Sequence, residues 1–294
     1  MNKHLRLAIV SLSFSTSMGV ALTLALSTGS AKVGVIPTFT VCAIISYALN
    51  YIVFVPSYLS RTEHYFDLTG SITTISLIIF AIASQDNPDT RSIMVALMVL
   101  VWAVRLGSFL FLRAKETGGD SRFDKIKQYP FSFLSWWSLQ ALWVLVNIAC
   151  ALTVLTTKEN EPFGIFGVIG AILWVSGFAI EIIADQQKKK FRREAKNKGK
   201  FINTGLWAWS RHPNYFGEII LWIGVAVIAF PVLSGWRWSA LISPIFVVVL
   251  ITRISGIPIL ERRAETQWGG NDDYKTYVDD TPMLLPRPPK TRLK

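Results

Sequence analysis

The stretch SRHPNYFGE, residues 210–218, gathers five side chains that can bind ions or exchange protons, just where an apolar segment begins. These are Arg211, His212, Asn214, Tyr215 and Glu218. An arginine beside a helix N-terminus suits an anion, whereas asparagine and glutamate exchange hydrogen bonds with hydroxyl and amide groups. The stretch therefore predicts a site that suits an anion.

The same stretch predicts the start of a helix, because proline is tolerated in the first helical turn. In a helix beginning at Pro213, Asn214 and Glu218 lie four residues apart on one face. A simpler interpretation is that Arg211 and His212 only sit among lipid headgroups. Asn214 and Glu218 lie inward of that layer, which favours a functional role.

A second polar stretch, EIIADQQKKKFRR (181–193), precedes the first. No proline or glycine occurs between Phe178 and Gly199, so we expect one helix that runs past the membrane surface. Glu181, Asp185 and Arg192 fall near one face of that helix. Most of the lysines are typical of a solvated face at the anionic cytoplasmic leaflet.

Further charged residues stand in apolar surroundings. Arg105 interrupts VLVWAVRLGSF, and Asp67 opens the apolar stretch after HYF. Charges in the bilayer are costly, and they usually pair or serve a function. Together with Glu181 and Asp185, they predict a polar cavity in the inner half of a helical bundle.

The composition indicates the class of fold that positions these residues. Of the 294 residues, 51% are hydrophobic and 17% charged, which is typical of a polytopic membrane protein. We expect an all-α bundle forming one membrane domain, 1–294, with N-terminal helices at 1–56, a substrate-side part at 57–130 and a nucleotide-binding part at 131–294. About 20 apolar residues cross a bilayer, and we expect seven or eight such segments. The candidates are 7–26, 36–56, 68–84, 93–112, 133–155, 163–185, 215–233 and 236–252.

The charge distribution predicts the orientation. With eight spans, 25 of the 30 Lys and Arg fall on one side and four (Lys32, Arg91, Lys158 and Arg237) in loops on the other. By the positive-inside rule, both termini and a polar cap over the bundle are cytoplasmic. Topology thus explains the net charge of +11, and we expect no nucleic-acid partner. An alternative for the first segment is a cleaved signal peptide.

The sequence lacks the motifs of several common binding and catalytic sites. The sequence contains no dinucleotide-binding glycine pattern, no Walker loop, no nucleophile elbow and no H-E-x-x-H. The three histidines are scattered, so we expect no metal site. Cys42 and Cys150 lie in apolar segments and are expected to be buried thiols.

The stretch GLWAWSRHPNYFGEIILWIG, preceded by EIIADQQKKKFRR and followed by DDYKTYVDDTPMLLP, resembles the C-terminal domain of the steroid 5α-reductase superfamily. It is most similar to the uncharacterised bacterial branch, whose members also carry stretches like RTEHYFDLTGS and VWAVRLGSFLFLR. The similarity covers the C-terminal half well and residues 61–124 more loosely.

This resemblance implies an NADPH-dependent membrane reductase of the bacterial inner membrane. It would transfer hydride to the carbon–carbon double bond of a hydrophobic enone, such as a 3-oxo-4-ene steroid. The hydrophobic or lipid substrate would enter from the bilayer, among membrane lipids. The residues that would hold NADPH are Asp185, Arg192, Asn214, Tyr215 and Glu218, with Arg211 and His212 as neighbours of its phosphates.

The resemblance also implies which residues would act on the substrate. The family uses a membrane arginine, which points to Arg105, and a Gln-Glu-Leu motif, which reads Phe-Asp-Leu at 66–68 here. Asp67 would replace the glutamate, and Tyr65 or His64 would be the proton donor. Asp67, Tyr65 and Arg105 are thus the expected catalytic residues.

Two other functions fit part of the pattern. Membrane methyltransferases of the isoprenylcysteine type bind S-adenosylmethionine and share an R-H-P-x-Y-x-G motif. They also have a glutamate before a tail with two tyrosines, and the stretch ERRAETQWGGNDDYKTY (261–277) is compatible with this pattern. Asn214, Glu218 and the long basic helix suit the larger dinucleotide better. The second alternative is a lipid-binding scaffold without enzymatic activity.

Overall fold

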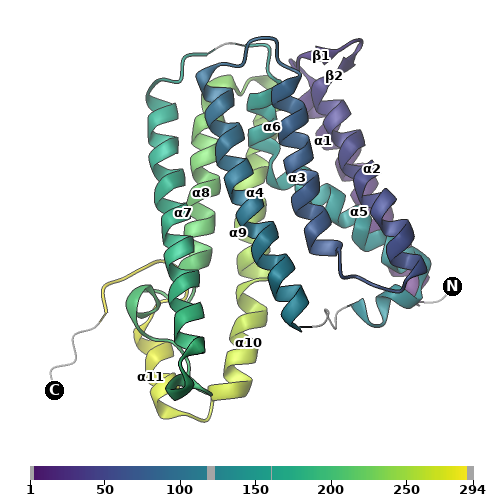
Figure 1. The fold of residues 1–294 in the computed structure, drawn as a ribbon. Helices are drawn as coiled ribbons and strands as arrows, with labels where there is room; N and C mark the ends of the chain where they lie inside the picture. The colour runs from purple at the N-terminus through teal and green to yellow at the C-terminus, as the bar shows by residue number, and fades with distance from the viewer. Residues whose placement is uncertain (1–2, 118–122, 160, 290–294) are drawn as a thin grey trace. The chain divides into compact units, whose positions relative to one another are not determined.

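A computed structural model describes residues 3–117, 123–159 and 161–289 of the chain (Figure 1). The described residues are predominantly helical, which confirms the all-α prediction. Residues 118–122 of the predicted inner segment 113–130 lie outside the described part, as do the last residues at each terminus. The chain divides into two compact units, Met1–Gly167 with Ile228–Ser243, and Val168–Val227 with Pro244–Lys294. Each is described by itself.

The first unit is built on helices α1 to α6. Their bounds are α1 Lys3–Ser27, α2 Thr38–Leu59, α3 Phe66–Ala83, α4 Thr90–Thr117, α5 Pro130–Asn147 and α6 Ala149–Thr156. Helices α1, α2 and α3 pack on α5, and α3 also packs on α4. A short antiparallel hairpin, β1 Lys32–Val33 and β2 Ile36–Pro37, joins α1 to α2.

The second unit contains most of the remaining helical residues, although α7 and α9 begin and α8 ends in the first unit. Their bounds are α7 Gly164–Arg193, α8 Pro213–Ala229, α9 Ile242–Val249, α10 Ile257–Trp268 and α11 Asp272–Asp280. A π-helical turn, Leu250–Ile254, follows α9. Asn271 caps α11, since its Oδ1 accepts hydrogen bonds from the backbone N–H groups of Asp273 and Tyr274.

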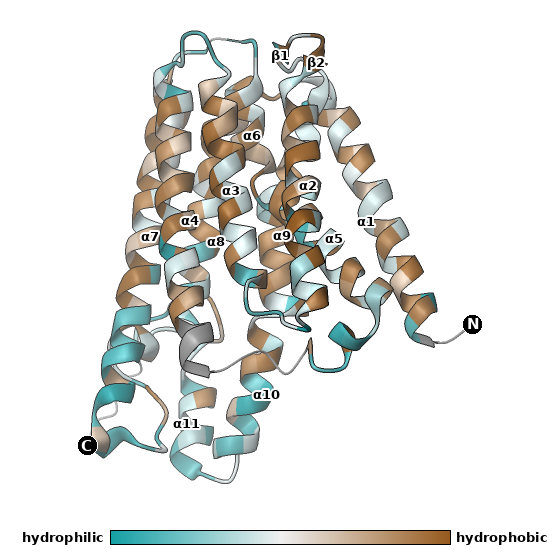
Figure 2. Ribbon diagram, turned by 45° about the vertical axis from the view of Figure 1, so that its right-hand side comes forward, coloured by the Kyte–Doolittle hydropathy of each residue, from teal (hydrophilic) through white to brown (hydrophobic). Residues whose placement is uncertain are grey.

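Among the described residues, seven helical stretches are long and apolar enough to cross a membrane, or eight if a bent pair counts as one span. They coincide with the eight predicted segments, and the fifth is the bent pair, Pro130–Asn147 with Ala149–Thr156. Brown, apolar residues dominate these helices in Figure 2. The chain is therefore an integral membrane protein, as predicted. Cys42 and Cys150 are both fully buried, as expected.

The bend in the fifth span measures 61° and falls at Ile148. A broken helix frees backbone carbonyls, which must find donors inside a bilayer. The hydroxyl of Ser243 donates a hydrogen bond to the carbonyl of Asn147, and the Cys150 thiol donates to the carbonyl of Ala240 at 3.1 Å. The Ser243 hydroxyl therefore satisfies one carbonyl beside the break.

Two of the four arginines and lysines predicted for outer loops lie elsewhere. Arg91 is in the first turn of α4 and Arg237 in a 3₁₀ segment, and they are only 1% and 2% exposed. Arg91 donates to the carbonyls of Ile228 and Pro162. Each guanidinium thus satisfies carbonyls at helix ends, which is a structural role.

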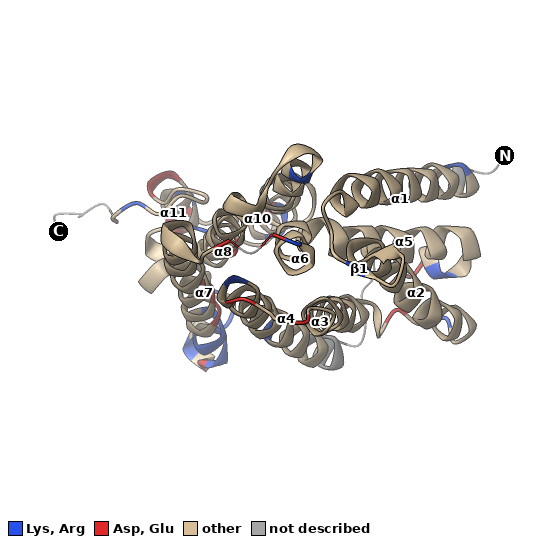
Figure 3. Ribbon diagram, turned by 90° about the horizontal axis from the view of Figure 1, so that it is seen from above, with Lys and Arg blue, Asp and Glu red and all other residues tan. Residues whose placement is uncertain are grey.

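Helix α7 has 30 residues. At a rise of about 1.5 Å per residue it is about 45 Å long, which exceeds the roughly 30 Å hydrocarbon core. Figure 2 shows its colour change from brown to teal toward the C-terminal end, and Figure 3 shows basic residues in blue there. The helix ends at Arg193, earlier than the glycine at 199. The Asn197 amide donates to the carbonyl of Phe191 at 3.0 Å, in the last turn.

Candidate functional site

Close backbone contact between α7 and α8 positions the predicted nucleotide-binding residues. A Cβ on Gly217 would lie 2.5 Å from the carbonyl oxygen of Gly177, and one on Gly224 would lie 2.6 Å from that of Gly170. The two contacts share one antiparallel register, in which Glu181 is level with the first turn of α8. Asn214 is thereby brought beside Glu181, with Asp185 about 8 Å further along α7.

The sequence prediction of a helix from Pro213 is confirmed. The hydroxyl of Ser210, fully buried, accepts a hydrogen bond from the backbone N–H of His212 at 3.1 Å. The same hydroxyl donates to the carbonyl of Leu284 at 2.9 Å. The His212 ring stacks on Tyr215, with ring centroids 5.8 Å apart. The Ser210 hydroxyl and the ring stack therefore hold the residues that lead into α8.

Arg211 and His212 share one carboxylate. Glu261 of α10 lies with Oε1 2.7 Å from His212 Nε2 and with Oε2 3.2 Å from Arg211 Nη1. The side chains of His212 and Arg211 are 6% and 14% exposed. The carboxylate therefore ties α10 to the residues that precede α8.

Buried polar atoms at this position lack hydrogen-bond partners among the described residues. They are Arg211 Nε and Nη1, His212 Nδ1 and Asn214 Oδ1. Arg211 Nη1 is close enough to Glu261 for an ion pair, but the geometry is not that of a hydrogen bond. A buried unsatisfied group costs about 1–3 kcal/mol. Donors and acceptors beside the amide end of a helix fit a ligand with anionic and polar groups.

The other predicted nucleotide-binding residues lie along α7 and α8. Glu218 and Asp185 are partly buried, and both interact with other groups. Arg192 is exposed in the last turn of α7, about 10 Å beyond Asp185 along the helix. In the register of α7 and α8, Asn214 lies between the levels of Glu218 and Asp185, about 6 Å from the first and about 8 Å from the second along the helix axes, with Arg192 at the outer end of the set.

The end of the chain runs alongside the residues before α8. The backbone N–H of Arg211 donates to the carbonyl of Pro282 at 2.9 Å, and that of Arg287 to the carbonyl of Trp209 at 3.0 Å. The Tyr277 hydroxyl donates to the carbonyl of Trp207 at 2.7 Å. Burial raises the pKa of Tyr277, the Arg211 charge opposes this, and Glu261 and Tyr274 raise it further.

The predicted catalytic residues Asp67, Tyr65 and Arg105 belong to the first unit. Tyr65, 50% exposed, precedes α3, and Asp67 lies in its first turn. A Cβ on Gly107 of α4 would lie 2.7 Å from the Ser71 Cβ of α3. Asp67 and Arg105 flank this contact, about 9 Å apart along antiparallel helices.

The start of α3 is held from α5 and by an aromatic cluster. The Gln140 amide donates to the carbonyl of Phe66 at 2.7 Å, and the Phe66 ring lies 5.1 Å from that of Trp137 and 4.9 Å from that of Phe123. Glu63 precedes α3, and its Oε2 lies 2.9 Å from Lys127 Nζ. The Lys127 pKa is raised, chiefly by its hydrogen bond to Glu63. These contacts fix the turn that carries Asp67.

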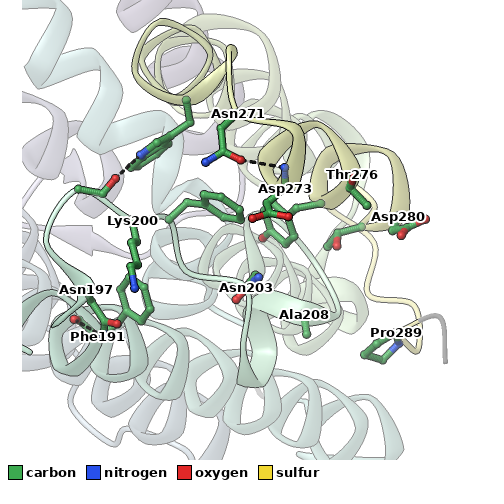
Figure 4. Close-up of a pocket in the computed structure, with 15 residues that line it drawn as sticks. Phe191, Asn197, Lys200, Asn203, Ala208, Asn271, Asp273, Thr276, Asp280 and Pro289 are labelled. Carbon is green, nitrogen blue, oxygen red and sulfur yellow. Dashed lines mark hydrogen bonds between the residues drawn. The ribbon is translucent and has the colours of Figure 1, made fainter. Parts of the chain in front are cut away.

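The second unit contains a pocket of about 610 Å³ (Figure 4). Residues from the loop after α7 and from α10 and α11 line it, among them Lys200, Asn203, Asn271 and Asp273. None of the predicted nucleotide-binding residues is among the described residues that line it. The pocket is therefore a separate feature of the same unit.

Sequence reasoning did not include Glu261 and Gln140 among the site residues. Glu261 lies 49 residues beyond His212. The signal for it was the methyltransferase pattern, which has a glutamate before the tyrosines of the tail as well as the R-H-P motif. Gln140 was one polar residue in an apolar segment, and its polarity was its only signal.

Comparison with known proteins supports the resemblance. Residues 50–281 match the model of a family described as a protein of unknown function, DUF1295. An uncharacterized protein of Schizosaccharomyces pombe is 23% identical over 232 residues, which is 68% of this chain and 65% of that protein.

Two relatives carry the names of reductases. The 3-oxo-5-alpha-steroid 4-dehydrogenase 1 of Mus musculus is 24% identical over 154 residues, 49% of this chain and 54% of that protein. Steroid 5-alpha-reductase DET2 of Arabidopsis thaliana is 32% identical over 76 residues, 25% of this chain and 26% of that protein. The chain thus covers less than two thirds of each relative. No solved structure gives a significant match. The resemblance to the steroid 5α-reductase superfamily is confirmed.

Proposed function

The chain belongs to the DUF1295 family, and we propose that it is an NADPH-dependent reductase of the membrane. It would transfer hydride to the carbon–carbon double bond of a hydrophobic enone, such as a 3-oxo-4-ene steroid. The relatives named as steroid 5α-reductases support the general class. What we propose beyond that class is the identity of the cofactor and of the substrate.

The observation that carries the proposal is the set of unsatisfied buried atoms between Arg211 and Asn214. NADPH offers phosphates for Arg211 and for the amide end of α8. It also offers ribose hydroxyls and a carboxamide, which suit Asn214 and the carboxylates of Glu218 and Asp185. The cofactor's groups therefore match the donors and acceptors that this unit presents.

The chain's own residues would bind and orient both reactants. Bound NADPH would supply the hydride to the β-carbon of the enone. Negative charge then develops on the carbonyl oxygen, so a cation or a hydroxyl donor must face it. Arg105 and the Tyr65 hydroxyl are the proposed groups, with Asp67 beside them.

The location of the protein follows from the same proposal. By the positive-inside rule, the start of α8, and with it the proposed nucleotide, would lie on the cytoplasmic side. We expect a bacterial inner-membrane protein with both termini in the cytoplasm, where NADPH is available. A hydrophobic enone would enter from the lipid.

A thermal-shift experiment on the detergent-solubilised protein tests the cofactor. We expect NADPH to raise the unfolding temperature, because a ligand that binds only the folded state stabilises it. S-adenosylmethionine is the control ligand. A shift with S-adenosylmethionine and none with NADPH would favour a methyltransferase and contradict the proposal. A protein that responds to neither would fit a lipid-binding scaffold, which also contradicts it.

A further inference from the structure

We propose that Glu261 is a positioning residue, which holds Arg211 so that its remaining donors bind a phosphate group at the start of α8. This inference rests on the proposed function, because it assigns the phosphates of the dinucleotide to Arg211. It adds a residue from α10 to a site otherwise built on α7 and α8.

The geometry of the carboxylate supports this role. Glu261 contacts Arg211 Nη1 with one oxygen and His212 Nε2 with the other, at 3.2 and 2.7 Å. Using both oxygens fixes the direction of the two side chains. Arginine otherwise loses about 2 kcal/mol of side-chain entropy when a ligand immobilises it. A carboxylate that immobilises it beforehand lowers this cost of binding.

The unsatisfied atoms indicate what these side chains face. Arg211 Nε and Nη1 have no hydrogen-bond partner among the described residues, although the side chain is only 14% exposed. His212 Nδ1, on a ring that is 6% exposed, also lacks a described partner. A guanidinium with buried donors, next to the amide end of a 17-residue helix, is suited to phosphate oxygens.

The charges in contact with Arg211 are compatible with an anion. Glu261 is a carboxylate that pairs with Arg211. Tyr274 and Tyr277 of α11 also lie near these two charges, and burial raises the pKa of both. They are neutral at physiological pH. Glu261 neutralises the guanidinium with which it pairs, and the start of α8 adds partial positive charge.

The alternative role for Glu261 makes the opposite prediction. If Glu261 only neutralised Arg211, removing its charge would strengthen the binding of an anion. If it positions Arg211, removing it would weaken binding, because the guanidinium would no longer be held in place. The sign of the change in affinity distinguishes the two roles.

The test measures the affinity of the solubilised full-length protein for NADPH and for inorganic pyrophosphate. We expect Glu261→Ala to weaken both about tenfold, and Arg211→Gln to weaken both at least as much. Glu265→Ala is the matched control, since it removes the same charge from an exposed position one turn along α10. It should leave both affinities unchanged.

Two conservative variants separate positioning from packing. Glu261→Gln keeps the size of the side chain but loses its charge, and Glu261→Asp keeps the charge but is shorter. Positioning through the ion pair predicts that Asp restores more of the affinity than Gln. A packing role predicts the reverse, and that result would overturn the proposal. These variants also serve if Glu261→Ala does not fold.

The remaining outcomes are also decisive. Unchanged or tighter binding by Glu261→Ala and Glu261→Gln would overturn the proposal, as would wild-type protein that binds no phosphate compound. Binding of pyrophosphate but not NADPH, with the same dependence on Glu261, would support the positioning role while the proposed function failed. A short-chain phosphatidic acid tests the lipid source. If it alone binds, and depends on Arg211 and Glu261, the phosphate belongs to a lipid headgroup.

Discussion

Gly177 and Gly217 bring the backbones of α7 and α8 into direct contact. A Cβ on either residue would lie 2.5 Å from the carbonyl oxygen of the other. Because the helices are antiparallel, this contact sets Asn214 level with Glu181. The position of the proposed nucleotide site therefore depends on two residues that have no side chains.

Replacing Gly217 with leucine should destabilise the protein by more than about 2 kcal/mol, since the helices must separate to admit the side chain. The unfolding temperature in detergent should fall, and NADPH affinity should fall with it. Gly270→Ala is the control, because a Cβ there meets nothing within 4 Å. Equal stability of the two variants would show that the helices do not pack as described.

Arg237 should contribute to stability. It donates to Thr157 Oγ1 at 2.9 Å and to the carbonyl of Thr153 at 2.8 Å. Arg237→Met would leave that buried carbonyl unsatisfied, and we expect a loss of about 2 kcal/mol in the free energy of unfolding. Lys158→Met, at a nearby exposed position, should change it little. Equal thermal stability of these two variants would refute the role assigned to Arg237.

The contact of Lys127 with Glu63 should make stability depend on alkaline pH. Its pKa in the folded state is raised, first by the hydrogen bond to Glu63. The contribution is therefore fully present below the lysine pKa of the unfolded chain, about 10.4, and is lost as pH rises through the folded value.

Unfolding temperatures measured from neutral to alkaline pH check this prediction. Lys127→Met should reduce the loss of stability at alkaline pH, whereas Lys125→Met, two residues away and exposed, should not. Identical pH profiles for wild type and Lys127→Met would contradict it.

Two asparagines distinguish the start of α8 from the pocket of Figure 4. Asn214→Ala should weaken NADPH binding about tenfold, because the amide would contact the nucleotide. Asn203→Ala, which alters the lining of the pocket, should bind NADPH normally. The dissociation constants of both variants check this. Normal binding by Asn214→Ala with loss in Asn203→Ala would place the nucleotide in the pocket instead.

The sequence was sufficient where local chemistry decides the structure. Proline at 213 predicted where α8 begins, and lengths of apolar sequence predicted the spans. It was insufficient where partners are distant in the chain. The pairing of Glu261 with His212, the bend at Ile148 and the burial of Arg91 all depend on contacts with other helices. Hydropathy cannot show such contacts, because it scores each segment alone.

The candidate site also has features that local sequence predicts and features that depend on contacts between distant residues. The polarity of Asn214 and Glu218 indicated their importance, but only the packing of α7 on α8 shows at which level of α8 Asp185 lies. The roles of Asp67, Tyr65 and Arg105 stay predictions. Asp67 and Arg105 lie on helices that pack together, on either side of the contact between Ser71 and Gly107.

The most direct measurement is NADPH consumption by the purified protein, followed by absorbance, against a panel of enones. The panel should include 3-oxo-4-ene steroids and fatty and isoprenoid enones, with Asn214→Ala as the control protein. The account predicts that at least one enone is converted to its saturated ketone with one NADPH consumed per product, and that Asn214→Ala loses this activity. Methyl transfer from S-adenosylmethionine, with no enone consuming NADPH, would contradict it.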